Sequence, residues 1–374
     1  MFPVNRFGRR RSALLTTGVA LTLVLAACGS SDSSSAGASG EQVSNAAGDA
    51  QVHLGMELLV AGLPFTAELQ AGGEAAAKET GVVLDVSAPS TFDPPTAISQ
   101  VNNFLSSGVD GLAIAPEPAP LWTRALTDAV TKTNGNTVAL QTPPAAGTAV
   151  KTYVGVDATE LGRQIAEEAI KSAKLGPDTT GEVIIGKCTT QSTPLTQTTG
   201  GMAEAVKEAL PNATLLDPFD SNSVPAQNFA AWEQEMRAHP DAVLVLGSCD
   251  QDGESMVKAK QVTGGKWAIG ATATTPGVLT AIADGTVASS VAQNWYVEGY
   301  TVTRLLAEGL KNNTTPVEGW INPGTTVITK ANVAEIVARD ASPEGQAAFY
   351  KPLVTKLWAD LDAATKPLAD AQSD

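Results

Sequence analysis

From residue 51 onward the sequence alternates between short apolar runs and longer segments whose apolar residues recur with helical spacing. Gly111–Ala115 reads GLAIA, a wholly apolar run that is typical of a strand covered on both faces. Segments such as Pro64–Glu79 and Ala158–Lys174 have the length and pattern of helices. This alternation predicts an α/β fold, in which parallel sheets carry helices on both faces.

The alternation runs through two cycles of similar order. The first begins at strand Val52–Leu59, and the second at Tyr153–Val156, where Asp157 is suited to capping the helix that follows. A chain of 374 residues suits two domains better than one core. We therefore expect two doubly wound parallel-sheet lobes joined by a hinge, with an interdomain cleft at the carboxyl ends of the strands.

The stretch Thr286–Gly299 marks a return of the chain from the second lobe to the first. An apolar run ends there at Gln293-Asn294, and a helix carrying Trp295 and Tyr296 begins at once. Together with two further crossings it gives the expected division: residues 51–156 and 294–320 form the N-terminal lobe, 157–293 and 321–342 the C-terminal lobe, and 343–374 an amphipathic helical tail packed on one lobe.

Three local expectations concern polar or interrupted segments. Pro118–Thr133 is predicted as one helix, and Thr214–Phe219 as one strand. Thr189–Gly201 is predicted as a long polar loop that precedes a helix at Met202–Leu210. Each prediction rests on composition and spacing.

The first residues carry an export signal. Arg9-Arg10-Arg11 precede the apolar segment Ser12–Leu25, which is short for a membrane span. Leu25-Ala26-Ala27-Cys28 resembles the lipobox of bacterial lipoproteins, which implies removal of residues 1–27 and acylation of Cys28. More than one acyl chain anchors a protein stably. Residues 28–50 are rich in Ser, Gly and Ala and predict a flexible tether.

The predicted location is therefore extracytoplasmic, at the bacterial cell membrane, through the acylated Cys28. The formal net charge of -15 argues against nucleic acid as a partner and against anionic membrane surfaces. Solubility outside the cell is a sufficient reason for such a charge.

The sequence does not match the signatures of common enzymes in full. Gly181–Cys188 is one residue short of a P-loop, and its apolar residues form the strand that a P-loop should follow. Ser255 and Lys258 have Ser-x-x-Lys spacing without the accompanying motifs. Neither histidine, His53 or His239, belongs to a metal-ligand spacing. We therefore expect no enzyme, no cofactor and no metal.

Cys188 and Cys249 follow the first and third predicted strands of the second lobe. In the flavodoxin-like order 2-1-3-4-5 these strands are neighbours, about 4.8 Å apart, within reach of a disulfide. Outside the cytoplasm such a bond persists. A Cys188–Cys249 disulfide at one lip of the cleft is one expectation, and two free buried thiols are the alternative.

Aromatic and amide side chains gather at the predicted cleft. Phe65 lies in the first helical turn after a strand, Phe219 ends a strand of the second lobe, and Gln293-Asn294 mark the crossing. Sugars are bound by stacking on aromatic rings and by hydrogen bonds to planar polar side chains. A sugar-binding cleft is one interpretation, and burial of the two phenylalanines in the core is the other. The position of Trp295 is compatible with either the cleft or the core.

With these residues in view, roughly Val52–Lys330 resembles the periplasmic sugar-binding proteins of the ribose/galactose type, which feed ABC importers. The resemblance implies a type I periplasmic binding protein fold that closes on its ligand by a hinge and performs no chemistry. The segments that carry it are Leu63-Pro64-Phe65, Val109–Pro116, Val156-Asp157 before a helix with Gly162, and Ala292-Gln293-Asn294.

Departures from the family pattern bear on the ligand. The family's Asp-Arg pair stands here as Gln141-Thr142, and the arginine expected in 189–201 is absent, which leaves Gln197 among the polar residues. The family's Asn-Asp and Phe-Asp pairs stand as Cys249-Asp250 and Ala271-Thr272. Neutral groups replace charged ones, so a small neutral hydroxylated ligand, a sugar or polyol, is expected. The expected ligand-binding residues are Phe65, Gln141, Thr142, Gln197, Phe219, Asp250, Thr272, Gln293 and Asn294.

The sequence thus predicts a monomeric, lipid-anchored solute-binding protein that delivers its ligand to an ABC permease. The alternative is a receptor of the same fold that presents a ligand, for example of autoinducer type, to a membrane sensor kinase or chemoreceptor.

Overall fold

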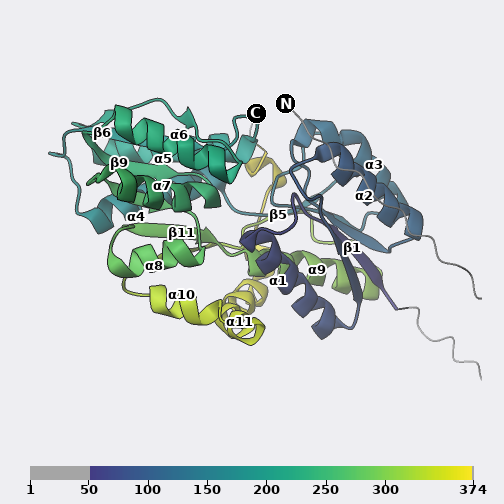
Figure 1. The fold of residues 1–374 in the computed structure, drawn as a ribbon. Coiled ribbons are helices and arrows are strands. Elements are labelled where there is room, and N and C mark those ends of the chain that lie inside the picture. The colour runs from purple at the N-terminus through teal and green to yellow at the C-terminus, as the bar shows by residue number, and fades with distance from the viewer. Residues whose placement is uncertain (1–50, 373–374) are drawn as a thin grey trace, which may run out of the picture. The chain divides into compact units, whose positions relative to one another are not determined.

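The computed structural model describes residues 51–372, which form two lobes, each built on its own sheet (Figure 1). The predicted signal peptide, the tether and Cys28 lie outside the described residues. No helix of the described part is both long enough and apolar enough to span a bilayer.

The sheet of the N-terminal lobe has the order β14-β12-β5-β4-β3-β1-β2, and all its pairs are parallel except β12 with β14. Its strands are β1 His53–Glu57, β2 Val83–Ser87, β3 Gly111–Ile114, β4 Thr137–Leu140, β5 Thr152–Val154, β12 Gly319–Ile321 and β14 Thr365–Lys366. Its helices are α1 Pro64–Thr80, α2 Pro94–Ser107, η1 Ala119–Trp122, α3 Thr123–Lys132 and α9 Trp295–Lys311.

The sheet of the C-terminal lobe has the order β13-β11-β10-β9-β6-β7, with β8 also paired to β6 and β13 antiparallel to β11. Its strands are β6 Glu182–Lys187, β7 Thr214–Leu215, β8 Phe219–Asp220, β9 Ala242–Gly247, β10 Ala268–Ala271, β11 Ser289–Gln293 and β13 Thr325–Ile328. Its helices are α4 Ala158–Ala173, α5 Thr193–Ala209, α6 Pro225–Ala238, α7 Asp250–Thr263, α8 Pro276–Asp284 and α10 Val333–Arg339.

The parallel strands of each lobe follow the order 2-1-3-4-5, when β7 and β8, which both pair with β6, are counted as one strand, so the predicted fold class of two doubly wound parallel sheets is confirmed. Strand β3 is buried along its whole length, as its apolar sequence requires. Asp157 caps α4, where its Oδ1 accepts a hydrogen bond of 3.0 Å from the Glu160 N–H.

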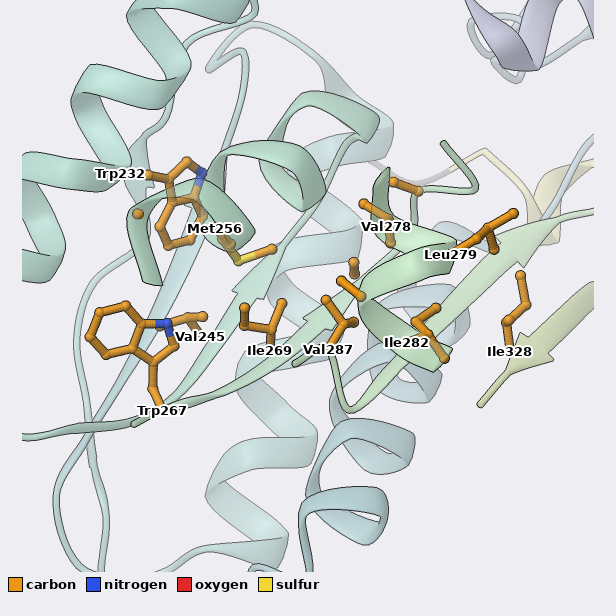
Figure 2. Close-up of a cluster of buried hydrophobic side chains, with 14 of the residues drawn as sticks. Trp232, Val245, Met256, Trp267, Ile269, Val278, Leu279, Ile282, Val287 and Ile328 are labelled. Carbon is orange, nitrogen blue, oxygen red and sulfur yellow. The ribbon is translucent and has the colours of Figure 1, made fainter. Parts of the chain in front are cut away.

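A separate apolar core supports each lobe. In the C-terminal lobe, side chains from β9, β10, α6, α7 and α8 meet in the cluster drawn in Figure 2. Two tryptophans of that cluster, Trp232 and Trp267, are almost wholly buried. Full burial of one such side chain contributes about 1.5–3 kcal/mol or more, which makes this cluster a major stabilising element of the lobe.

In each lobe, one pair of helices packs closely together through glycines on the surfaces that face each other. A Cβ on Gly72 of α1 would overlap the carbonyl of Tyr296 in α9, and a Cβ on Gly299 would overlap that of Leu69. In the other lobe, Gly162 of α4 and Gly201 of α5 stand in the same relation to Thr198 and Thr159. Each pair of backbones therefore approaches more closely than any larger residue permits.

Three local predictions were wrong. The expected loop 189–201 is mostly helix, because α5 begins at Thr193 behind Ser192, whose Oγ accepts a hydrogen bond from the Leu195 N–H. The expected strand 214–219 is two short strands, β7 and β8. The expected helix 118–133 is the short turn η1 followed by α3.

The chain passes between the lobes at three strand ends: after β5, after β11, and between β12 and β13. The single-residue lobe boundaries given above stay predictions.

The chain passes once more from the C-terminal lobe to the N-terminal lobe, at the start of the tail. After α10, which packs on α8, helix α11 (Pro343–Ala359) contacts α9 and α1 of the N-terminal lobe, and β14 then joins that lobe's sheet (Figure 1). The tail is thus not helical throughout. Besides α11 it contains only α12 Leu361–Ala364, β14 and η2 Leu368–Asp370 among its described residues.

A buried polar cluster holds the tail against both lobes. The Tyr350 hydroxyl donates to Glu68 of α1 over 2.5 Å, and Arg339 of α10 donates to the same hydroxyl over 2.7 Å. Arg339 also lies 3.9 Å from Glu68. Burial raises the pKa of Glu68, and the nearby Arg339 charge opposes that rise.

Candidate functional site

A cavity of about 260 Å³ lies between the lobes at the carboxyl ends of the strands. Its volume is close to the lower end of ordinary small-molecule sites, about 300–1000 Å³. The following polar and aromatic side chains line it from the two lobes: Phe65, Phe92, Glu117, Gln141, Thr142 and Trp295 from the first, and Thr189, Ser192, Thr198, Ser223, Ser248, Asp250, Gln251, Thr272 and Gln293 from the second.

Six of the predicted binding residues line this cavity: Phe65, Gln141, Thr142, Asp250, Thr272 and Gln293. They come from five different connections or strand ends, since Gln141 and Thr142 both follow β4, and the doubly wound topology brings them to one place.

The other three predicted residues do not line the cavity. Asn294 is buried at the hinge, where its side chain accepts from Thr326 Oγ1 over 2.6 Å and donates to the Pro323 carbonyl over 3.2 Å. Phe219 packs edge-on against Trp232, with ring centroids 4.8 Å apart, at the border of the lobe core. We therefore no longer place Asn294 or Phe219 in the binding site.

Gln197 lies in α5, in the segment that was predicted as a loop, and the helix places it outside the cavity lining. Ser192, Leu195 and Thr198 line the cavity at intervals of three residues, which is one face of a helix start. Gln197 lies on α5 but off that face, and it does not line the cavity.

Two aromatic rings of the N-terminal lobe form a tilted pair on the lining. The centroids of Phe65 and Trp295 are 5.2 Å apart, with 39° between the ring planes. Trp295, which the sequence left undecided between core and cleft, therefore lines the cavity beside Phe65. Ring faces of this kind accept either the C–H face of a sugar or a cation.

Gln141 is held in a left-handed conformation at the end of β4, with φ of 61°. Its N–H donates to Glu298 Oε1 over 2.6 Å, and its carbonyl accepts from the Tyr153 hydroxyl over 3.3 Å. Burial raises the pKa of Glu298 to about 8, against the lowering effect of the Gln141 N–H. Glu298 is therefore mostly protonated at neutral pH.

Glu117 was missed by the sequence analysis. Its buried carboxyl accepts hydrogen bonds from the Thr142 hydroxyl, at 2.6 Å, and from the Ser192 hydroxyl and the Thr193 N–H at the start of α5. Burial raises its pKa, and these donors oppose the rise. Glu117 thus joins the N-terminal lobe to the first turn of a C-terminal-lobe helix. Its place just after β3, at the carboxyl edge of the sheet, was the available signal.

Asp250 lies in the first turn of α7 and contributes a half-buried carboxyl to the cavity. Burial, together with the negative charges of Glu68 and Asp252, raises its pKa to about 7. Its protonation is therefore sensitive to whatever occupies the cavity.

Cys188 and Cys249 are joined by a disulfide in the structure, with Cα atoms 6.4 Å apart, and both line the cavity. Their strands, β6 and β9, are neighbours in the sheet. Asp252 lies within 4.8 Å of both sulfur atoms, a grouping that resembles a metal site. Metal ligation needs thiolates, however, and bonded sulfurs are not thiolates, so we assign no metal there.

Asp252 holds the turn that carries Ser248 and Cys249. Its Oδ1 accepts from Asn228 Nδ2 and Trp232 Nε1, each at 2.8 Å. Its Oδ2 accepts from the N–H groups of Ser248 and Cys249, at 2.9 and 3.3 Å. Four donors on one wholly buried carboxylate fix the cavity wall on this side.

Comparison with known proteins agrees with this architecture. Residues 58–314 match the family described as the periplasmic binding protein domain. No curated protein matches the chain. The chain belongs to this family, and the predicted family resemblance and fold class are confirmed.

Three similar structures illustrate the fold. A glucose-galactose binding protein from Geobacillus stearothermophilus, GanP, is 21% identical, with a TM-score of 0.67 over 76% of this chain and 99% of its own. An ABC transporter solute binding protein from Burkholderia graminis, in complex with D-arabinose, is 20% identical, with a TM-score of 0.67 over 76% and 96%. The XylFII-LytSN complex contains a chain that is 17% identical, with a TM-score of 0.64 over 75% and 99%.

Proposed function

We propose that this protein is an extracytoplasmic solute-binding protein that captures a small hydroxylated compound, of the sugar or polyol class, in the cavity between its lobes. The observation that carries the proposal is the lining itself, which draws aromatic rings and side-chain amides from both lobes at the carboxyl ends of their strands. Two similar proteins support the ligand class, since GanP is described as a glucose-galactose binding protein and the Burkholderia graminis protein is in complex with D-arabinose. Neither the lining nor the family suggests that it is an enzyme.

Delivery to an ABC permease and membrane anchoring belong to the same proposal. Residues 1–27 act as a lipoprotein signal peptide, Cys28 carries the acyl groups, and residues 28–50 tether a monomeric folded body to the cell membrane. Mass spectrometry of the mature N-terminus tests this part, since an unmodified cysteine or a different cleavage site contradicts it.

A thermal-shift screen of sugars and polyols tests ligand capture. A ligand at a hundredfold its dissociation constant stabilises the folded state by about 2.7 kcal/mol. For domains of this size that corresponds to roughly 5–11 °C, at about 2–4 °C per kcal/mol. The absence of a shift from every hydroxylated compound contradicts the proposal.

Gln293→Ala tests the site itself. Gln293 ends β11 and lines the cavity, so loss of its amide should weaken binding about tenfold while the free protein melts as before. Gln197→Ala is the matched control, because Gln197 lies outside the lining. Equal binding by both variants places the ligand elsewhere.

A sensor receptor is the second candidate. The observation in its favour is the XylFII-LytSN complex among the similar structures. Co-purification of the native protein from its membrane distinguishes the two, since transport predicts permease subunits and sensing predicts a kinase or chemoreceptor.

A further inference from the structure

The ionisable side chains that line the cavity are all acidic. Among the described residues that line it, two are acidic, Glu117 and Asp250, and none is Lys, Arg or His. The positive contributions at its wall come from helix N-termini, namely the first turns of α1, α5, α7 and α9. Asp250 receives no hydrogen bond from the described residues that would stabilise its negative charge, and its strongest electrostatic neighbours are acidic.

Three of the lining hydroxyls add to this excess of acceptors. Thr142 donates to Glu117, Thr272 to the Val291 carbonyl over 2.9 Å, and Thr198 to the Pro194 carbonyl over 2.9 Å. With its proton committed inside the protein, each of these hydroxyls has only lone pairs left for a ligand. The amides of the lining glutamines offer donors and acceptors in equal number and do not restore the balance.

Ser248 supplies an independent sign that a polar ligand group belongs beside Asp250. Its side chain is 4% exposed and lines the cavity, and its Oγ has no hydrogen-bond partner. A buried hydroxyl without a partner is costly, so a ligand atom is expected to complete it. Ser248 and Asp250 flank Cys249 in the same turn.

The opposite wall suits a cation as well. Phe65 and Trp295 present aromatic rings from the N-terminal lobe. A cation near such a face is attracted by the ring quadrupole, and the attraction grows when water is excluded.

We propose that the ligand is a small hydroxylated amine in its protonated form, of the amino-sugar or aminated-polyol class, whose ammonium group is bound by Asp250 with Glu117 across the cleft. This inference rests on the proposed function and narrows its ligand class from hydroxylated compounds in general to those that carry a positive charge, in place of the neutral ligand expected from the sequence. Three ammonium N–H donors match the excess of acceptors, and the positive charge compensates the buried carboxyls. The raised pKa values of Glu117 and Asp250 agree with this inference, since burial is the largest cause of both and a positive charge beside them would oppose it.

Calorimetric titration with matched compounds tests the proposal. The amines are D-glucosamine, D-galactosamine, D-mannosamine and 1-amino-1-deoxy-D-glucitol. Each is compared at about pH 7 with its neutral hydroxyl parent and, for the sugars, with its N-acetyl derivative, which keeps the nitrogen and loses the charge. A charged hydrogen bond of about 1.5–3 kcal/mol corresponds to roughly 10- to 100-fold tighter binding of one amine over its parent.

Substitution of each carboxylate tests which of them binds the ammonium group of the ligand. Asp250→Asn should bring the amine-to-parent ratio close to one, and Glu117→Gln should lower it less, because Glu117 is already bonded by three protein donors. Asp178→Asn, an exposed acid in the loop before β6, is the matched control and should leave the ratio unchanged. The melting temperature of each free variant shows whether it folds.

The outcomes separate the two proposals. A neutral parent that binds as tightly as its amine overturns the cationic ligand and leaves the proposed function standing. A ratio that survives both Asp250→Asn and Glu117→Gln also overturns it. If neither amines nor neutral sugars and polyols bind, the proposed function fails and this inference fails with it.

Discussion

The two walls of the cavity are built differently. On the C-terminal side, the disulfide Cys188–Cys249 and the carboxylate of Asp252, with its four donors, hold the turn 248–249. On the N-terminal side, the Gln141 N–H donates to Glu298 Oε1, whereas Glu298 Oε2 has no partner, and Oε1 of the buried Glu57 in the same lobe also lacks one.

The difference shows two ways to bury an acid. Where donors surround a carboxylate, as at Asp252, they oppose the rise in pKa that burial causes, and the group stiffens its surroundings. Where one oxygen is unpaired, the group keeps its proton instead, as the pKa of about 8 for Glu298 shows. The turn at Asp252 is therefore held by its donors, whereas the protonation of Glu298 responds to pH.

Loss of the disulfide should have the largest effect on stability. The bond closes a loop with a sequence separation of 61, for which chain entropy predicts about 4 kcal/mol of stabilisation. Urea unfolding with and without reductant measures it, and a Cys188→Ser/Cys249→Ser variant, which reductant cannot affect, is the control. Two free thiols in the native oxidised protein would show that this wall is not cross-linked.

Asp252→Asn should have the second largest effect on stability. The amide places N–H groups against two of the four donors, and leaving about two buried donors unsatisfied costs about 3 kcal/mol. Calorimetry should then show a fall in Tm of about 6–12 °C. Asp178→Asn should change the unfolding free energy by less than about 0.5 kcal/mol. Equal melting of both variants would mean that the four-donor network does not stabilise this wall.

Glu298→Gln tests the pH response of the other wall. The folded-state pKa of about 8 lies above the ordinary value of 4.5, so between these values the unfolded chain releases a proton that the native protein keeps. Stability is therefore lost as pH rises through this window. Wild type should lose about 1.4 kcal/mol relative to Glu298→Gln between pH 6 and 7, measured by urea unfolding. Parallel pH curves for the two proteins would refute a protonated Glu298.

Gln141→Gly should have the smallest effect on the fold. Glycine relieves a left-handed conformation that costs about 1–2 kcal/mol, but it adds chain entropy and removes the weak 3.5 Å hydrogen bond from the Leu59 N–H. The net change in unfolding free energy should stay within about 1 kcal/mol, while ligand affinity falls. Asn134→Gly, at an exposed left-handed position, is the control that should leave affinity intact.

The sequence predicted the architecture because alternation and burial pattern are local signals. The wholly apolar β3 and the Asp157 cap of α4 could be located without tertiary information. The same rule, applied to the carboxyl ends of strands, found six lining residues, and it would have found Glu117 if carried one residue past Pro116.

Tertiary contacts decided what the sequence could not show. The Thr- and Gly-rich start of α5 has low helix propensity, and it packs closely on α4, where Gly162 faces the Thr198 carbonyl and Gly201 faces the Thr159 carbonyl. Glu298 occupies a helix position where an acid is normally exposed, and only the packing of α9 over Gln141 buries it.

Strand β14 has a consequence for the chain's behaviour at high concentration. It pairs antiparallel with β12, which would otherwise form the border of the N-terminal sheet with its backbone N–H and C=O groups open to solvent. Unpaired borders of this kind recruit strands from other molecules and start aggregation. The two-residue strand Thr365–Lys366 is too short to offer a long template itself, so the end of the tail protects the lobe against intermolecular strand pairing.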